Sequence, residues 1–189
     1  VFTDIGARLQ GVNYAAVAWG DYDNDAKLDL LVTGGDDDST GMADLYHNNG
    51  DDTFTRVPNA GFIPVTLSAV AWGDFDNDGR LDVLINGLAY GNPTSWQTDI
   101  YHNNGDGTFT RLSAGLFGVR EGSVCIGDYD NDGRLDLLTA GFNYGSYVLH
   151  VYHNDGNNTF TDLNLGLQGV AFGDAQWVDF DNDGCLDIF

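Results

Sequence analysis

The sequence has few basic residues and almost no glutamate. Seven Lys and Arg stand against 29 acidic residues in 189, and Glu121 is the only glutamate, which leaves 28 aspartates. Binding to nucleic acid or to anionic membrane surfaces relies on Lys and Arg that neutralise phosphates, so a formal net charge of −22 argues against both as partners. Cations are the natural counterpart of such a chain.

Cysteine and long hydrophobic runs are also scarce. Cys125 and Cys185 are too few for a disulfide framework. No apolar run approaches the roughly 18 residues of a membrane span, so we expect no membrane insertion. The first ten residues lack the basic start and apolar stretch of a signal peptide, and the chain begins with Val1, as a mature product or a part of a longer chain would.

The composition is nevertheless that of a folded protein. The chain is 42% hydrophobic and 13% aromatic, whereas disordered acidic chains are poor in both classes. At 189 residues one domain is the default expectation.

A segment of 14 residues recurs along the whole chain. AWGDYDNDAKLDLL at 18–31 returns at 71–84, 125–138 and 176–189, with spacings of 53, 54 and 51 residues. A second motif keeps step with it: LYHNNGDDTFTRV starts at Leu45, and related segments start at Ile100 and Val151. Self-similarity at such a period is typical of a repeat architecture.

Each unit has the pattern of a small antiparallel sheet. Short segments rich in Val, Ile, Leu, Tyr, Phe and Thr alternate with Gly, Asn and Asp clusters, and none has a sustained period of 3.6. Four such strands per unit, A to D, predict a propeller blade; a parallel β-helix, whose repeats are usually shorter, is the alternative. We therefore predict an all-β fold, a β-propeller or partial propeller of four-stranded antiparallel blades with about 3.5 repeats of ~53 residues.

The repeats predict the boundaries of one domain over 1–189. It comprises a leading strand D at 1–5, complete blades at 14–57, 66–112 and 121–163, and trailing strands A and B at 173–189. In such blades the A–B loops and C–D turns share one face, and the B–C and D–A connections share the other. The first set repeats almost verbatim and the second set varies, so we expect the variable face to carry function.

The A–B loop has the spacing of a metal-binding loop. Asp stands at loop positions 1, 3, 5 and 9 with Gly at 6 in three copies, so alternate carboxylates can face one point and the carbonyl at position 7 can add an oxygen. Oxygen donors favour Ca²⁺ over Zn²⁺, and we predict up to four structural Ca²⁺ ions. The predicted metal residues are Asp21, Asp23, Asp25, Lys27, Asp29, Asp74, Asp76, Asp78, Arg80, Asp82, Asp128, Asp130, Asp132, Arg134, Asp136, Asp179, Asp181, Asp183, Cys185 and Asp187.

The alternative is that these loops are Asp-rich turns that cap their own backbone. Four copies in register favour the metal, because turn chemistry alone does not require four carboxylates that repel one another. The first loop has Ala26 where the others have Gly, and a left-handed backbone would be strained there. We expect the first site to be the weakest.

GDYDNDGRLDLL followed by YHNNGDGTFT resembles the FG-GAP/VCBS repeat family of integrin-like propellers over essentially the whole chain. The resemblance implies Ca²⁺ in the A–B loops, an extracellular or cell-surface location, and a non-enzymatic role in adhesion or carbohydrate binding. Seven blades are usual in that family, about twice the number in this chain. A longer propeller, a ring closed by two copies and an end-to-end polymer all remain open, and all would cover open sheet edges.

Four aromatic residues on the B–C connections are candidates for a platform that binds a sugar: Tyr90, Trp96, Tyr144 and Tyr147. Asn157 begins the only N-glycosylation pattern, on a predicted hairpin turn. The recurring His47, His102 and His153 are interpreted as strand residues that bond their own hairpins, with a ligand contact as the alternative. Trp19, Trp72 and Trp177 share one position on strand A and are predicted to lie between blades.

The sequence contains none of the nucleophile, phosphate-binding or HExxH motifs of common enzymes. We therefore expect an extracellular, calcium-stabilised module that binds a glycan or a protein. The alternative is a structural subunit that self-associates through its open end strands, as a dimeric ring or a head-to-tail filament. A glycan-acting hydrolase is a distant third hypothesis, because no pair of carboxylates stands out.

Overall fold

The computed structural model describes residues 2–37, 40–90 and 95–189, in which the secondary structure consists of strands only. The first blade holds β1 (Asn13–Gly20), β2 (Asp29–Asp37), β3 (Thr40–Asn48) and β4 (Phe54–Arg56). The second holds β5 (Val65–Gly73), β6 (Asp82–Ala89), β7 (Ser95–Asn103) and β8 (Phe109–Arg111). The third holds β9 (Arg120–Gly127), β10 (Asp136–Asn143), β11 (Ser146–Gly156) and β12 (Thr159–Asp162). A final pair consists of β13 (Trp177–Val178) and β14 (Asp187–Ile188).

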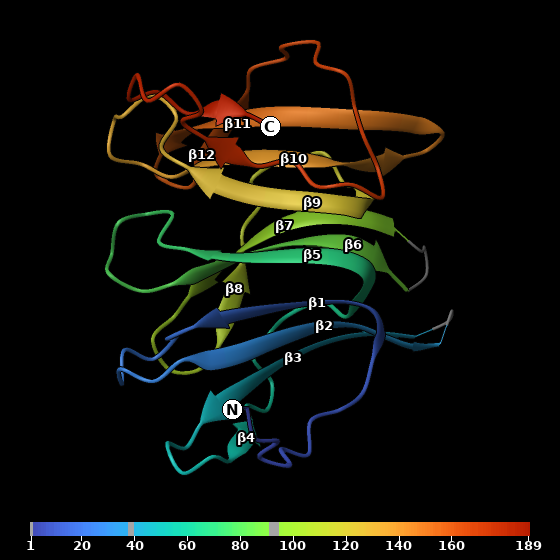
Figure 1. Cartoon of the computed structure of the whole chain (residues 1–189), viewed down its shortest axis with the longest axis vertical. Coiled ribbons are helices and arrows are strands. Elements are labelled where there is room, and N and C mark those ends of the chain that lie inside the picture. Colours follow the sequence, from blue (N-terminus) through green and yellow to red (C-terminus); the bar gives the residue numbers. More distant parts are fainter. Residues whose placement is uncertain (1, 38–39, 91–94) are drawn as a thin grey trace.

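Each blade is an antiparallel sheet whose strands pair in chain order. Single bridges at the connections link neighbouring blades: Met42 pairs with Val65, and Gln97 pairs with Val119. The blades stack so that β1, β5 and β9 follow one another (Figure 1). The predicted all-β, four-stranded antiparallel architecture of a partial propeller is confirmed.

The described chain does not close a ring. Its two ends lie toward opposite ends of the stack (Figure 1). Residues 2–12 form no strand, so the predicted leading strand at 1–5 is wrong. In a complete blade, strand D pairs with strand C, as β4 pairs with β3. A leading strand D would need such a strand C in the last unit, and the described part of that unit has only β13 and β14.

The hydrophobic core is divided between the blades because side chains on a strand alternate between its two faces. Leu31 on β2 faces the second blade, and Leu84 on β6 faces the third. Val83, next to Leu84, points back toward the first blade. All three are fully buried, and burial of such a side chain stabilises the fold by about 1.5–3 kcal/mol.

Glycine at the end of strand A lets successive blades approach closely. A Cβ atom on Gly20 would lie 2.7 Å from Cγ of Trp72, and one on Gly127 would lie 2.9 Å from Cδ1 of Trp177. In the fourth unit the same position holds Val178, and its side chain is exposed because no described blade follows it.

Trp72 and Trp177 pack in the cores between sheets, as the sequence predicts. For Trp19 the prediction differs from the structure: the side chain is 54% exposed, because no sheet among the described residues lies before the first blade. Instead, the N-terminal segment crosses that face, where Leu9 and Val12 pack against Leu30.

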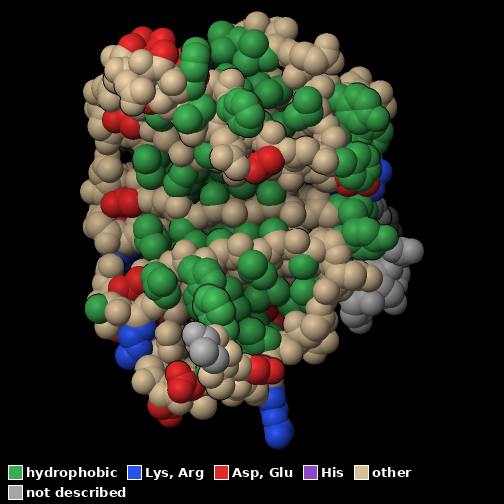
Figure 2. All heavy atoms as spheres, in the orientation of Figure 1, with side chains coloured by type: hydrophobic (Ala, Val, Ile, Leu, Met, Phe, Trp, Pro, Cys, Tyr) green, Lys and Arg blue, Asp and Glu red, His purple; other side chains and the backbone are tan. Residues whose placement is uncertain are grey.

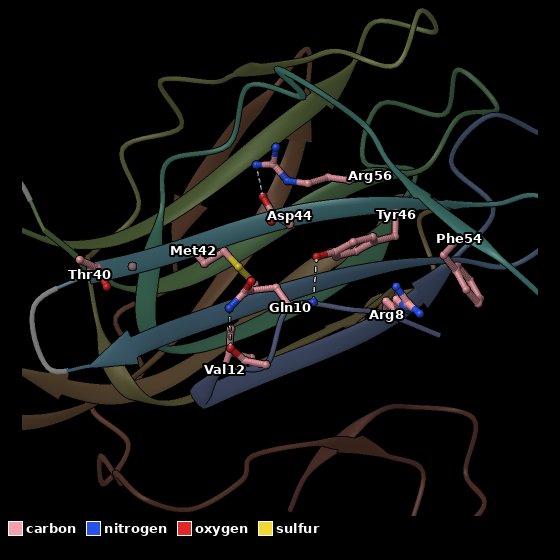
Figure 3. A pocket seen from close by; sticks show the side chains of 11 residues that line it. Arg8, Gln10, Val12, Thr40, Met42, Asp44, Tyr46, Phe54 and Arg56 are labelled. Carbon is pink, nitrogen blue, oxygen red and sulfur yellow. Dashed lines mark hydrogen bonds and ion pairs between the residues drawn. The ribbon is translucent and has the colours of Figure 1, made fainter. Parts of the chain in front are cut away.

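A hollow of about 620 Å³ remains between this segment and β3 (Figure 3). Its wall contains Tyr46, whose hydroxyl accepts a hydrogen bond from the backbone N–H of Gln10 at 3.4 Å.

The two loop faces are well separated. The A–B loops emerge on the left in Figure 1 and the B–C connections on the right. Acidic side chains stand one above another along the left side (Figure 2). Within the described ranges, no helix is long and apolar enough to cross a membrane.

Candidate functional site

The A–B loops share one backbone conformation that is held by their first aspartate. In the first loop, the Asp21 carboxylate accepts hydrogen bonds from the backbone N–H groups of Asp25 at 3.0 Å and Ala26 at 2.9 Å. Asn24 and Ala26 have left-handed φ values of 59° and 67°. The expected left-handed backbone at Ala26 is therefore present, and the matching Gly79, with φ 86°, shows why glycine suits this position.

The aspartate at position 9 is the most buried part of each cluster. Asp29, Asp82 and Asp136 are at most 1% exposed, and each accepts two backbone N–H bonds. Burial raises the pKa of Asp82 to about 6, and it also raises the pKa of Asp29 and of Asp136. A carboxylate in such surroundings is stabilised by a nearby cation.

A histidine from strand C faces each of the first three loops. In the first blade, Nδ1 of His47 lies 3.2 Å from Oδ2 of Asp23 and 3.2 Å from Oδ1 of Asp29. His102 and His153 repeat this arrangement at 3.2–3.4 Å. The interpretation of these histidines as partners of their own hairpins is therefore wrong: they face the carboxylates of the A–B loop.

The side chain at position 7 of the A–B loop contacts both its own loop and the neighbouring C–D hairpin. Arg80 donates from Nε to the carbonyl of Asn103 at 2.9 Å and also pairs with Asp78. Lys27 and Arg134 pair in the same way with the carboxylate two residues earlier. In the fourth loop Cys185 takes this position, so that loop holds four carboxylates without a basic side chain of its own.

The carboxylates fit a Ca²⁺ ion. Ca²⁺ takes oxygen ligands at about 2.3–2.6 Å, so oxygens around one ion lie within about 5 Å of each other. Oxygens of Asp21, Asp23 and Asp29 lie within 4.8 Å of one another, as do those of the matching residues of the second loop. Groups such as Asp23, Asp25 and His47 add one nitrogen donor beside the oxygens.

Successive A–B loops are hydrogen-bonded to each other, a contact that the sequence did not predict. Nδ2 of Asn24 donates to the carbonyl of Gly79 in the next loop at 3.1 Å. Asn77 and Asn131 make the same bond to the loop that follows each of them. The recurring DYDND and DFDND sequences contain the signal, because their Asn stands between the Asp positions of the cluster.

Aromatic side chains gather on the opposite, variable face. The rings of Trp96 and Tyr144 lie 3.7 Å apart between centroids, and Phe142 lies 5.6 Å from Trp96 and 5.7 Å from Tyr147. We call these four residues the aromatic shelf. Tyr144 and Tyr147 are 73% and 58% exposed.

The guanidinium group of Arg120 packs against the aromatic shelf. Its Cζ atom lies 5.5 Å from the ring centroids of Trp96 and Phe142. The structure thus brings three of the four predicted aromatic residues together. The fourth, Tyr90, lies near Arg120 in the wall of a separate hollow.

The repeated loops can now be compared with known families. A sequence model of the FG-GAP-like repeat matches residues 21–85, 88–139 and 128–189. The chain belongs to the FG-GAP-like repeat family. FG-GAP repeat proteins are generally non-enzymatic and are typically extracellular or on the cell surface. No curated protein matches the chain.

The predicted glycosylation residue lies on the repeated-loop side of the third blade's hairpin. Asn157 lies in the turn between β11 and β12, on the same face as the A–B loops. It is exposed and has a left-handed φ of 52°. Attachment of a glycan there stays a prediction.

Proposed function

We propose that this FG-GAP-like chain is a non-enzymatic, extracellular binding module that is stabilised by calcium and takes a carbohydrate or protein ligand on its variable face. The observation that carries the proposal is the aromatic shelf. Exposed aromatic rings offer a large apolar area at little cost in conformational entropy, and Tyr and Trp add a polar atom for hydrogen bonding.

The position of the shelf supports this assignment. Trp96 is on β7 of the second blade, whereas Phe142, Tyr144 and Tyr147 lie at the β10–β11 connection of the third. The shelf therefore spans a junction between blades, on the face where the connections differ from unit to unit. Loops held on a rigid scaffold are the usual place for binding residues.

Glycan-array and cell-adhesion measurements on the purified chain test the ligand. The double variant Trp96→Ala, Tyr144→Ala should lose at least tenfold in affinity, since aromatic anchors at an interface contribute about 2 kcal/mol or more each. Phe180→Ala is the matched control, because Phe180 is 72% exposed on the A–B loop of the last unit. Equal binding by the wild type and the double variant would rule the shelf out.

Calcium is assigned to the A–B loops, which hold two to three buried or half-buried carboxylates each in the first three blades. The carboxylates at positions 1, 3, 5 and 9 and the carbonyl at position 7 would hold the ion, whose charge would balance the buried aspartate. One site at about ten times its dissociation constant adds about 1.4 kcal/mol, so four sites add about 5–6 kcal/mol.

Thermal unfolding with and without a chelator tests this assignment. At about 2–4 °C per kcal/mol for a chain of this size, excess chelator should lower Tm by about 10–20 °C. Added Ca²⁺ should restore Tm, and Mg²⁺ should do so less well because it prefers smaller octahedral sites. A melting curve that is indifferent to chelator would overturn the calcium proposal.

Self-association through the end sheets is a second candidate, favoured by exposed apolar side chains at both ends. Val17, Trp19 and Leu28 are 54–60% exposed on the first blade, whereas the counterparts of Val17 and Trp19 in the second and third blades and that of Leu28 in the third are packed. Phe180 and Phe189 are 72% and 88% exposed on the last pair of strands. Each end thus presents one half of a contact between blades.

Val178 prevents the two ends from meeting as the internal blades do. Its place corresponds to Gly20, where even a Cβ atom would come 2.7 Å from a ring atom of Trp72. A second copy that presented Trp19 to Val178 would therefore need a different register. Light scattering at rising concentration tests the proposal, and a monomer at every concentration for both the wild type and Val178→Gly would refute it.

A further inference from the structure

Residues at or shortly before the starts of the four strands A line one hollow on the variable face. Its volume is about 390 Å³, within the roughly 300–1,000 Å³ of ligand pockets. Four of its lining residues hold the same position in successive units, with spacings of 53, 54 and 51 residues. They are Tyr14, Leu67, Glu121 and Phe172, and they are joined by Arg120 and Tyr90.

These four residues all have a backbone conformation that favours glycine. Their φ values are 45°, 52°, 56° and 56° in chain order, which is uncommon for residues with large side chains. Glycine occurs at 26 positions of the chain but at none of these four. Strained backbone that is kept at one place in every unit is typical of functional sites. In the first three units this position lies at a bulge in the pairing of strands A and B, and bulges re-aim side chains; here all four side chains line the hollow.

Polar atoms without partners line the same hollow. Thr66 is 2% exposed, and its Oγ1 has no hydrogen-bond partner among the described residues. Nε of Arg120 is also buried and unpartnered in the described part of the chain. Buried polar groups are almost always hydrogen-bonded, so such atoms in a pocket wall point to a bound molecule.

The charges in the hollow are balanced. Nη1 of Arg120 lies 2.9 Å from Oε1 of Glu121, the only glutamate of the chain. The pair offers donors and acceptors side by side but no net charge, which excludes recognition by charge alone. Around it, Tyr14, Phe172 and Leu67 offer apolar surface.

We propose that this hollow binds one neutral pyranose ring, such as a terminal sugar of a glycan. Hydroxyl groups of the sugar would donate to Glu121 and accept from Arg120 and Thr66, while an apolar face of the ring would pack on the aromatic side chains. The inference rests on the proposed function, because it places the ligand on the same face. Arg120, which is stacked between the hollow and the aromatic shelf, joins the two into one surface.

Saturation-transfer NMR and calorimetry with methyl glycosides of glucose, galactose, mannose, N-acetylglucosamine and fucose test the inference. Thr66→Val removes the unpartnered hydroxyl with little change of shape, so the fold should keep its stability. Affinity for the bound glycoside should fall about two- to tenfold, the effect of one hydrogen bond. Glu121→Gln should lower it about ten- to a hundredfold, because bonds to a charged group are stronger.

Two control variants carry the same changes elsewhere. Thr139 has an equally buried and unpartnered Oγ1 on β10, outside the hollow, so Thr139→Val should leave affinity unchanged. Asp52 has a φ of 65° in a turn where the second blade has Gly107. Asp52→Gly therefore releases the same kind of strain as Phe172→Gly, but only Phe172→Gly should weaken sugar binding.

The outcomes separate this inference from the proposed function. Binding of a glycoside that falls in Thr66→Val and Glu121→Gln but not in the controls supports the hollow. Binding that depends on Trp96 and Tyr144 but not on Thr66 or Glu121 overturns the hollow and leaves the shelf in place. If none of the glycosides binds, the pyranose inference is wrong, whereas glycan-array and adhesion results still decide the proposed function.

Discussion

The buried asparagine of strand C should hold neighbouring blades together. Nδ2 of Asn103 donates across the blade boundary to the carbonyl of Tyr22 at 2.8 Å and within its own blade to the carbonyl of Leu81 at 3.0 Å. Its Oδ1 accepts from the backbone N–H of Gly105 at 2.9 Å. Asn103 is fully buried, so Asn103→Ala leaves these groups without partners.

The first blade supplies a matched control. Asn48 has the same place in the repeat and makes only the two bonds within its blade, from Nδ2 to the carbonyl of Leu28 and to Oδ1 from Gly50. No described blade precedes it, so it has no carbonyl to reach. At both positions the hydrogen bond from the backbone N–H to the buried aspartate does not involve the side chain. The change to alanine therefore preserves this bond and the shape of the A–B loop.

The expected free energies follow from counting bonds. Three buried bonds at about 1 kcal/mol each, plus about 1 kcal/mol for the unsatisfied Tyr22 carbonyl, predict a loss of about 3–4 kcal/mol for Asn103→Ala. Two more exposed bonds predict a loss of about 1–2 kcal/mol for Asn48→Ala. The difference of about 2 kcal/mol corresponds to about 4–8 °C in Tm.

Thermal melting of both variants in the same calcium-containing buffer measures this difference, with urea midpoints as an independent scale. Asn154→Ala should behave like Asn103→Ala, because Asn154 donates to the Phe75 carbonyl at 2.9 Å in the next pair of blades. If Asn48→Ala lowers Tm as much as Asn103→Ala does, the bond between blades contributes nothing and the reasoning is refuted.

Three further predictions concern stability. Ala26→Gly should raise the free energy of unfolding by about 0.5–1 kcal/mol and tighten calcium binding in the first loop, since φ of residue 26 is 67°. Gly79→Ala should lower the free energy of unfolding in urea, because its φ is 86° while the space around the added Cβ is open. Gly73→Val should lower the free energy of unfolding by about 2–3 kcal/mol, because the added Cβ would lie 2.8 Å from Cδ1 of Ile126. Val178→Gly, at the matching position of the last unit, should change Tm little at low protein concentration, because the Val178 side chain is exposed. Burial raises the pKa of Tyr101 from 10.0 to about 12, so its contribution of about 2–3 kcal/mol is complete below pH 10 and is lost as pH rises through 12. Burial raises the pKa of Tyr22 and of Tyr152 to about 12 as well, so Tyr101→Phe should make the alkaline decline in Tm smaller without abolishing it.

Sequence spacing was sufficient to predict whatever depends on residues that are close along the chain. The period of about 53 residues predicts four-stranded blades, and the Asp spacing predicts which carboxylates converge, because both features are local. The predicted burial of Trp19 between blades and the predicted strand at 1–5 failed for a shared reason. Each depends on a neighbouring sheet that the described chain does not supply, and a repeat pattern does not reveal which copy lies at an end.

Contacts between distant segments could not be predicted in this way. His47 lies 18 residues beyond Asp29 on a different strand, and only the antiparallel pairing of β2 and β3 brings the two together. The hollow was missed because the left-handed residues that form it share no residue type: Tyr14, Leu67 and Glu121 look unrelated in the sequence. Their common spacing was the available signal, and it becomes visible only when φ is known.

The two faces of the stack differ in how strongly their loops are constrained. On the A–B side, Asn24 and Asn77 join each loop to the next, so a change of length in one loop would break bonds in its neighbour. The other side also has contacts between units, such as the bridges Met42–Val65 and Gln97–Val119, but these use backbone groups and do not require a particular side chain. The connections there differ between units, and the copies of the 14-residue segment are spaced by 53, 54 and 51 residues. We therefore expect side chains to vary mainly where the hollow and the aromatic shelf lie, so that the proposed ligand binding can change there without altering the A–B loops.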